Sequence, residues 1–151
     1  MNNLHEQISV FTRRMGHLNA ACCDECCGEQ VSMIQSHILA EVRRLEIPSM
    51  QRVAGELGMD VTTFSRQAKT LEEKGLLSRR VSRDDRRVFL LGLTAEGALM
   101  LERIDRFMAQ RLEQVFAGMT PFELESVVRS LGLLNGVLTH AGFRKKVECC
   151  K

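Results

Sequence analysis

Residues 60–93 read DVTTFSRQAKTLEEKGLLSRRVSRDDRRVFLLGL, and the hydrophobic period changes within this stretch. Before Gly75, apolar residues recur every three or four positions, which is typical of a helix with one buried face. After Gly75, two short apolar segments, 76–81 and 88–93, flank the charged segment 82–87. Val88 and Phe89 favour a pleated backbone, so the pattern predicts a helix over about 61–74 followed by a β-hairpin with a solvated tip.

The expected helix over 61–74 has one apolar face and one polar face, and Asp60 can cap its start. The apolar face consists of Val61, Phe64, Ala68 and Leu71. The polar face carries small, polar or basic side chains: Thr62, Thr63, Ser65, Arg66 and Lys69. A short helix precedes it, with Ser49 as its cap and Gly58 as its end, so the two form a helix–turn–helix.

Positive charge is concentrated in the same region. Residues 61–91 contain eight Lys or Arg against four Asp or Glu, while the whole chain has a net charge of only +2. A helix–turn–helix followed by a basic hairpin is a winged helix–turn–helix, in which the second helix reads base edges and the hairpin contacts DNA. A charged hairpin alone is usually a solvated face, but this combination favours double-stranded DNA. The candidate DNA-binding residues are Thr62, Thr63, Ser65, Arg66, Lys69, Arg83, Arg86 and Arg87.

Helical patterns flank this region on both sides. We expect a first helix over about 4–22, a second from Val31 to Leu45, and a long helix over 95–116 capped by Thr94. Thr120 and Glu123 form a capping box that opens the last helix. The predicted fold is mainly α with a small β wing. It is a single domain, 1–151, with the winged helix–turn–helix over 34–94 and a helical dimerisation region over 1–30 and 95–151.

Three segments resemble the MarR-type winged-helix transcriptional regulators: LEEKGLLSR at 71–79, DRR at 85–87 and LTAEG at 93–97. The similarity extends from about Gln35 to Gly97. It implies that TFSR at 63–66 is the recognition segment, that Arg86 approaches the minor groove, and that Asp85 positions the wing arginines. It also implies an obligate homodimer in which the first, fifth and sixth helices of both chains interleave.

The six cysteines are unusual for this family. They are Cys22, Cys23, Cys26 and Cys27 at the end of the first helix, and Cys149 and Cys150 beside the C-terminus. If the first helix continues through the cluster, Cys22 lies over Cys26 and Cys23 over Cys27, so three thiolates can converge. Thiolates prefer soft cations and thiophilic metalloids. The spacing resembles the adjacent-cysteine sites of metalloid-responsive repressors, which favours trivalent antimony or arsenic as inducer.

Other interpretations of the cysteines stay open. Copper(I) is one, and zinc is another because Cys149 and Cys150 could supply a second pair of ligands. A peroxide or disulfide sensor would use the same thiols, although such sensors in this family commonly orient the reactive cysteine with tyrosines, and the chain has none. Cys22 alone fits a small buried hydrophobe, and the terminal pair fits a disordered tail. Metal storage would need more than six cysteines.

The sequence argues against several other classes of protein. No apolar stretch approaches the roughly 20 residues of a membrane span, and the start lacks a basic segment followed by an apolar run. The four histidines are scattered, and no phosphate loop, nucleophile elbow or paired-carboxylate motif is present. We therefore expect a cytoplasmic repressor with no membrane partner, no catalytic residues and no catalytic cofactor. Its homodimer would leave operator DNA when a metalloid binds.

Overall fold

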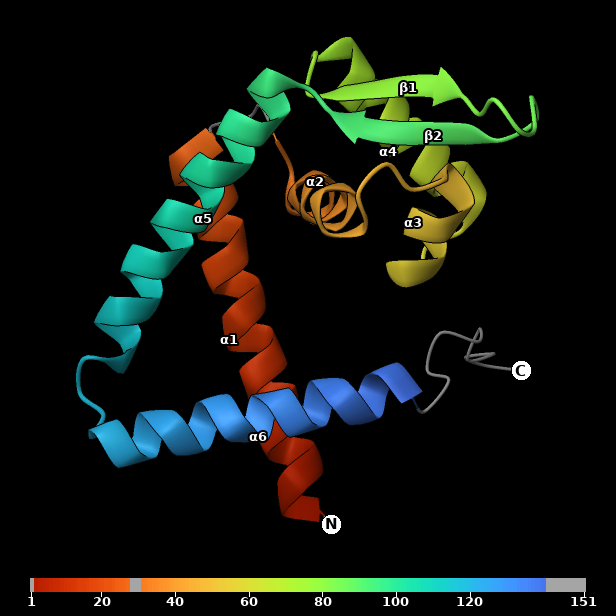
Figure 1. Cartoon of the computed structure of the whole chain (residues 1–151). Coiled ribbons are helices and arrows are strands. Elements are labelled where there is room, and N and C mark those ends of the chain that lie inside the picture. The colour runs from red at the N-terminus through yellow and green to blue at the C-terminus, as the bar shows by residue number, and fades with distance from the viewer. Residues whose placement is uncertain (1, 28–30, 141–151) are drawn as a thin grey trace.

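The computed structural model describes residues 2–27 and 31–140, with side chains placed for 3–17 and 31–138. Its elements follow in the order α1 (Asn2–Cys27), α2 (Met33–Leu45), α3 (Met50–Glu56), α4 (Val61–Glu73), β1 (Leu77–Val81), β2 (Phe89–Leu93), α5 (Ala95–Phe116) and α6 (Pro121–His140). The two strands form an antiparallel hairpin (Figure 1). The expected fold class, mainly helical with a small β wing, is confirmed.

The helix starts are those that the capping residues predict. The side chains of Ser49, Asp60 and Thr94 each accept a hydrogen bond from the backbone N–H three residues on. One helix end differs, because α1 continues to Cys27 rather than ending near residue 22. No glycine or proline interrupts the chain between Cys22 and Gly28, so nothing there stops the helix.

The core joins α2, α3, α4, the hairpin and the start of α5 around Phe64, Leu71 and Leu91, which are fully buried. Val61, which we expected on the apolar face of the helix over 61–74, is exposed instead. It is the first residue of α4. Leu39 and Met100 are also buried in this core, whereas Leu99 and Val115 on α5 are exposed in the described protomer.

A short extended segment before α3 adds to the hairpin, which the sequence did not reveal. The Pro48 carbonyl accepts a hydrogen bond from the Leu91 N–H at 2.9 Å, and Ser49 forms an isolated antiparallel bridge with Leu90. Within the hairpin, Leu77 pairs with Leu93 and Val81 with Phe89. The start of the helix–turn–helix is therefore attached directly to the wing.

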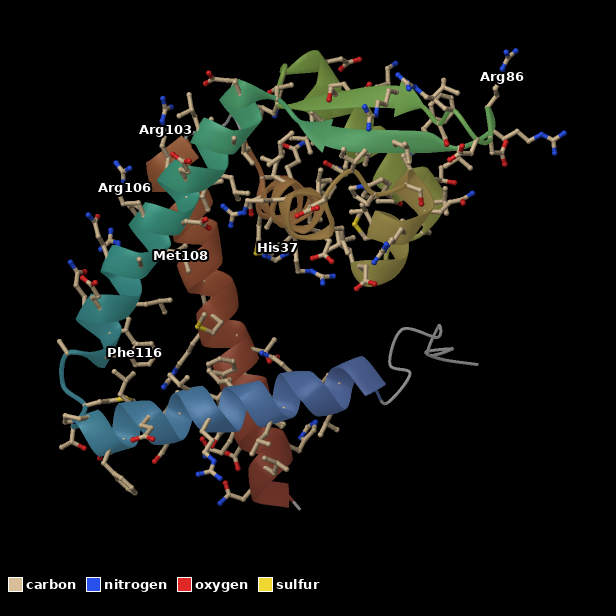
Figure 2. All side chains as sticks on the ribbon, in the orientation of Figure 1. His37, Arg86, Arg103, Arg106, Met108 and Phe116 are labelled. Carbon is tan, nitrogen blue, oxygen red and sulfur yellow. The ribbon has the colours of Figure 1, made fainter. Side chains whose placement is uncertain are left out.

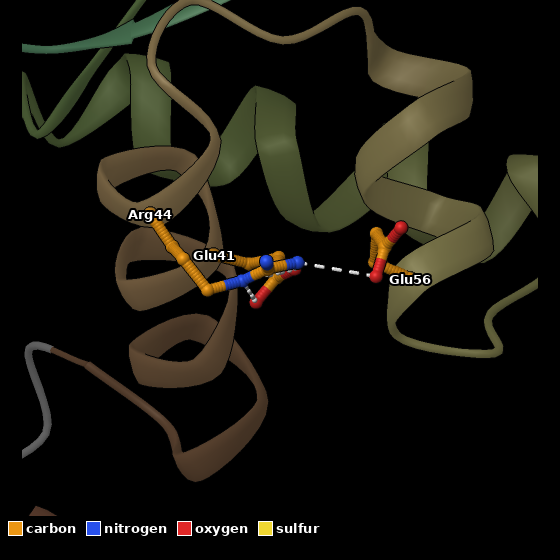
Figure 3. A network of polar contacts seen from close by, with 3 residues as sticks. All are labelled: Glu41, Arg44 and Glu56. Carbon is orange, nitrogen blue, oxygen red and sulfur yellow. Dashed lines mark hydrogen bonds and ion pairs between the residues drawn. The ribbon is translucent and has the colours of Figure 1, made fainter. Parts of the chain in front are cut away.

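Ion pairs fix α2 to its neighbours. Arg44 bridges Glu41 on its own helix and Glu56 on α3, the latter at 3.1 Å between Nη2 and Oε2 (Figure 3). Arg43 reaches Asp105 on α5 at 2.8 Å. These pairs hold the helix–turn–helix to the long helix that follows the wing.

The remaining helices form an arm below the wing domain. Helix α1 packs against α5, and α6 follows the end of α5 that is far from the hairpin and crosses the N-terminal half of α1 in this view (Figure 1). Within the described protomer, α6 has no extensive contact with another element. A search of the described helices finds none with the length and apolarity that crossing a bilayer requires.

Candidate nucleic-acid interface

Helix α4 presents one strip of side chains to the core and another to solvent. Phe64, Ala68 and Leu71 are buried. Because successive residues are about 100° apart around a helix, the opposite strip carries Thr62, Arg66 and Lys69, all exposed. We call this exposed strip the crest of α4.

Two polar contacts, one on each flank of the crest, fix the rotation of α4. On the flank toward α2, the Gln67 side-chain oxygen accepts a hydrogen bond from the Gln35 amide at 3.1 Å. On the flank toward the wing, the Arg79 Nε of β1 lies 3.4 Å from Glu72. The polar face expected from the sequence is therefore divided, since Thr63 lies on the Gln67 flank and the half-buried Ser65 lies on the Glu72 flank.

The tip of the wing is organised by Asp85. Its carboxylate accepts a hydrogen bond from the Arg87 N–H at 2.8 Å, and its carbonyl accepts one from the Val88 N–H at 2.9 Å. These bonds close a tight turn, as Asp side chains often do in loops. Arg86 sits in this turn and points away from the body of the molecule (Figure 2).

The cations on this side of the molecule differ in whether they have an acidic partner. Arg66, Arg83, Arg86 and Arg87 form no ion pair with any residue that the structure describes. Arg79 is engaged, because besides Glu72 its guanidinium lies over the Phe89 ring, 4.9 Å from the centroid. Four of the predicted DNA-binding residues are thus positive charges available to an external anion.

The N-terminus of α4 is already neutralised from within the chain. The Asp60 carboxylate accepts a hydrogen bond from the Thr63 N–H at 2.9 Å. Hydrogen bonding with the Thr63 side chain, and then with this N–H, lowers the pKa of Asp60 below its ordinary value. The carboxylate therefore stays ionised at neutral pH and occupies the position at which a helix start would bind an external anion. We therefore expect any contacts to phosphate to come from the unpaired arginines.

A pocket of about 180 Å³ lies between α4 and the wing, and no pattern in the sequence predicts it. The N-terminal ends of α3 and α4 form one side, and the base of the wing forms the other. Its lining residues are Ser49, Met50, Gln51, Val61, Ser65, Arg87, Val88 and Phe89. Only Ser65 and Arg87 among them were predicted to contact DNA.

For the predicted cysteine site, the structure describes the backbone of the 22–27 segment but no cysteine side chain. The backbone of α1 is helical through Cys27, which is the condition under which Cys22 and Cys26 stand one turn apart. The side chains of Cys22, Cys23, Cys26 and Cys27 lie outside the described part of the structure, as do Cys149 and Cys150 entirely. Among the side chains that are placed, no three His, Cys, Asp or Glu residues come together in a way that could hold a metal ion.

Comparison with known proteins agrees with this geometry. Residues 31–89 match the model of the MarR family. FabT of Streptococcus pneumoniae, solved in complex with DNA, superposes with a TM-score of 0.79 at 22% identity, covering 93% of this chain and 98% of that one. Apo MarR from E. coli gives 0.76 at 20% identity, covering 87% and 95%. BpsR of Bordetella bronchiseptica, whose DNA binding is regulated by 6-hydroxynicotinic acid, gives 0.68 at 23% identity, covering 85% and 98%.

These identities are low, so the solved structures establish the shared fold, and the family match covers the helix–turn–helix and most of the wing. Both agree with the crest of α4 and the arginine-rich hairpin. Residues 31–89 therefore resemble the MarR family, and the chain as a whole shares the winged helix–turn–helix fold of the solved structures.

Proposed function

We propose that this protein is a transcriptional repressor whose homodimer binds duplex operator DNA. The crest of α4 enters the major groove, and the wing follows the adjacent backbone and minor groove. The observation that carries this proposal is the set of four arginines, on α4 and the wing, that have no acidic partner within the described residues. The complex of FabT with DNA, on the same fold, supports it.

The apolar surface of the helical arm supports the homodimer. Phe122 is 78% exposed, and further exposed apolar residues on α1 and α6 are Leu4, Ile8, Phe11, Leu124, Val128, Leu133, Leu134, Val137 and Leu138. An apolar surface of this extent marks an interaction site. Because α6 has no extensive contact within the described protomer, a second copy is the partner that covers it. We expect recognition helices about 34–36 Å apart, one turn of DNA.

The proposed inducer is trivalent antimony or arsenic bound by cysteine thiolates of the 22–27 segment, with Cys149 or Cys150 as a supplementary ligand. The helical backbone through Cys27 supports it, since Cys23 and Cys27 are then one turn apart. A thiolate set without histidine suits soft metalloids. The proposed setting is the cytoplasm, where thiols remain reduced.

A contiguous path leads from the cysteine segment to the recognition helix. Helix α1 packs along α5. The first residue before α5, Thr94, donates a hydrogen bond to the Gly75 carbonyl in the turn that ends α4. A shift of α1 on metalloid binding would therefore reach α4 through packed elements. Thiol oxidation, copper(I) or zinc would act on the same residues and are the alternatives that the test separates.

The experiment has two stages. Duplexes selected from a random pool by the full-length protein are tested for tight binding, with dimer stoichiometry measured by analytical ultracentrifugation. Arsenite, antimonite, copper(I), zinc and peroxide are then compared side by side for release of the selected duplex, with thiol-alkylated protein as control. We expect release by the trivalent metalloids at the lowest concentrations. Failure to select any duplex contradicts the DNA-binding proposal, and release by peroxide alone contradicts the metalloid proposal.

A further inference from the structure

The surface between the recognition helix and the wing contains exposed apolar side chains whose sequence pattern predicts burial. Val61, the first residue of α4, is 56% exposed, and Phe89, the first residue of β2, is 39% exposed. Both line the pocket between the two elements. Apolar side chains that are exposed beside the unpaired Arg87 fit a ligand that is anionic overall and carries one apolar group.

We propose that Val61 and Phe89 form a contact site for the C5-methyl group of a thymine and so determine part of the operator sequence. This inference rests on the proposed DNA-binding function. Thymine is the only base that presents a methyl group in the major groove, and apolar side chains are the groups that recognise it. The N-terminal residues of a recognition helix are those that contact base edges, and Val61 occupies that position.

The composition of the pocket fits this ligand. Met50 and Val88, both half-buried, complete the apolar wall with Val61 and Phe89, while Arg87 contributes a cation. An apolar floor beside the unpaired Arg87 guanidinium matches the major-groove edge of a thymine next to its phosphates. Ser65, one turn along α4 from Val61, also lines the pocket, so a base that meets Val61 lies on the wing side of the bases that Arg66 on the crest reaches.

The apolar wall is held in place before any ligand arrives. The guanidinium of Arg79 covers one face of the Phe89 ring at 4.9 Å and is itself 3.4 Å from Glu72 on α4. On the other side of the pocket, the cap formed by Asp60 fixes the first turn of α4 and with it Val61. A wall that does not reorganise loses little entropy on binding, which lets a single methyl group be sensed.

The test removes the methyl groups of the selected operator one at a time by replacing each thymine with uracil, which leaves its hydrogen-bonding edge unchanged. We expect wild-type protein to lose about fourfold in affinity at one thymine per half-site, as the burial of one methyl group predicts, and to tolerate uracil nearby. Val61→Ala should bind the thymine and uracil operators equally. Arg106→Ala, on α5 and outside both the pocket and the crest of α4, is the control and should keep the wild-type profile.

Each result decides the inference. Sensitivity to uracil that disappears in Val61→Ala and persists in Arg106→Ala supports it. Wild-type protein that tolerates uracil at every position, or a Val61→Ala profile identical to wild type, overturns it while the DNA-binding function stands. Because Val61 is exposed and alanine is a good helix former, the variant should fold, which circular dichroism checks. Absence of binding to any duplex overturns the proposed function and this inference together.

Discussion

The Thr94 hydroxyl donates a hydrogen bond to the Gly75 carbonyl at 2.6 Å and, at the same oxygen, accepts one from the Gly97 N–H at 3.0 Å. The first bond holds the turn that ends α4, and the second caps the start of α5. Two of the segments that resemble the MarR-type regulators, 71–79 and 93–97, therefore meet at Thr94. The recognition helix and the long helix of the arm are joined at this point as one unit.

The turn at Gly75 explains the sequence of residues 71–76, which end α4. The Gly75 N–H donates to the Glu72 carbonyl and the Leu76 N–H donates to the Leu71 carbonyl, both at 2.9 Å, which is the Schellman arrangement of a helix end. Gly75 has a φ of 71°, which favours glycine. These motif residues therefore shape the end of α4.

We predict that Gly97→Ala strongly destabilises the protein. A Cβ at Gly97 would lie 2.0 Å from the Leu76 carbonyl oxygen, so the first turn of α5 must move away from the end of α4. Overpacking of this kind costs about 1–3 kcal/mol or more in the free energy of unfolding. Urea unfolding at fixed protein concentration measures it.

Gly55→Ala is the matched control for that prediction. Gly55 is an exposed residue within α3, and an added Cβ there meets no atom within 4 Å. The substitution should leave the protein as stable as wild type or stabilise it by up to about 1 kcal/mol. Equal unfolding midpoints for Gly97→Ala and wild type would contradict the close approach of α5 to Leu76.

We predict that Arg66→Ala weakens specific DNA binding more than any other single change on the crest of α4. Arg66 is exposed on that crest and has no ion-pair partner within the described residues, so it is available for a base contact worth about 1–3 kcal/mol. Fluorescence anisotropy with the selected operator measures the loss. Arg106→Ala, on α5 away from the wing (Figure 2), is the control and should bind as wild type does. Tight binding by Arg66→Ala would remove α4 from the interface.

For the wing, we predict that Arg86→Ala lowers affinity and also flattens its dependence on salt. Arg86 projects from the turn that Asp85 closes, where a guanidinium meets the DNA backbone or groove (Figure 2). Each lost phosphate contact reduces the slope of log K against log salt by roughly 0.9. Binding isotherms between low and moderate salt give the slope. A variant whose slope equals that of wild type would show that the wing tip does not contact DNA.

The sequence predicted the helix starts well because short-range signals determine them. Ser49, Asp60 and Thr94 each cap the helix that follows, and such bonds involve only neighbours in the chain. The strand-like pairing of Pro48 with Leu91 was missed because it joins segments more than 40 residues apart. The exposure of Val61 was missed because helical periodicity predicts which face of the helix a residue occupies. It does not predict whether another element covers that face.

The sequence predicted the charged residues of the candidate site but not its exposed apolar residues. Basic residues at helical spacing and in a hairpin are visible in the sequence, and Arg66 and Arg86 are exposed as expected. Phe89 belongs to an apolar strand pattern that predicts burial, yet its position at the end of the hairpin leaves it open. The apolar stripe of α6 has the same ambiguity, because a helix face that a partner covers has the pattern of a core helix.

We predict that Glu123→Gln reduces the loss of stability in acid. The Glu123 carboxylate accepts hydrogen bonds from the Thr120 N–H and hydroxyl, each at 2.8 Å, and these bonds hold its pKa below the ordinary value. A lowered pKa stabilises the folded state above the pKa of the unfolded chain, about 4.3, and this stabilisation disappears as the pH falls through the folded pKa. Urea unfolding at a series of pH values tests it.

Glu125→Gln is the control for the acid measurement. Glu125 lies two residues further along α6 and is exposed, and no hydrogen bond to its carboxylate is found among the described residues. We expect this variant to keep the pH dependence of wild type, whereas Glu123→Gln varies less with pH below about pH 4.3. Identical curves for wild type and Glu123→Gln would show that the capping box does not contribute to acid stability.

Finally, we predict that replacing Cys23, Cys26 and Cys27 with Ser abolishes release of DNA by antimonite and leaves operator binding intact. These residues lie at the C-terminal end of α1 and belong to neither α4 nor the wing, so the apo dimer should bind its operator as before. In the wild-type protein, metalloid affinity should rise with pH over the range in which the thiols ionise, because the thiolate is the ligand. Truncation after Lys146 removes residues 147–151, and with them Cys149 and Cys150, and should weaken the metalloid response while release persists. A triple variant that still leaves the operator when antimonite is added would exclude the 22–27 segment as the sensor.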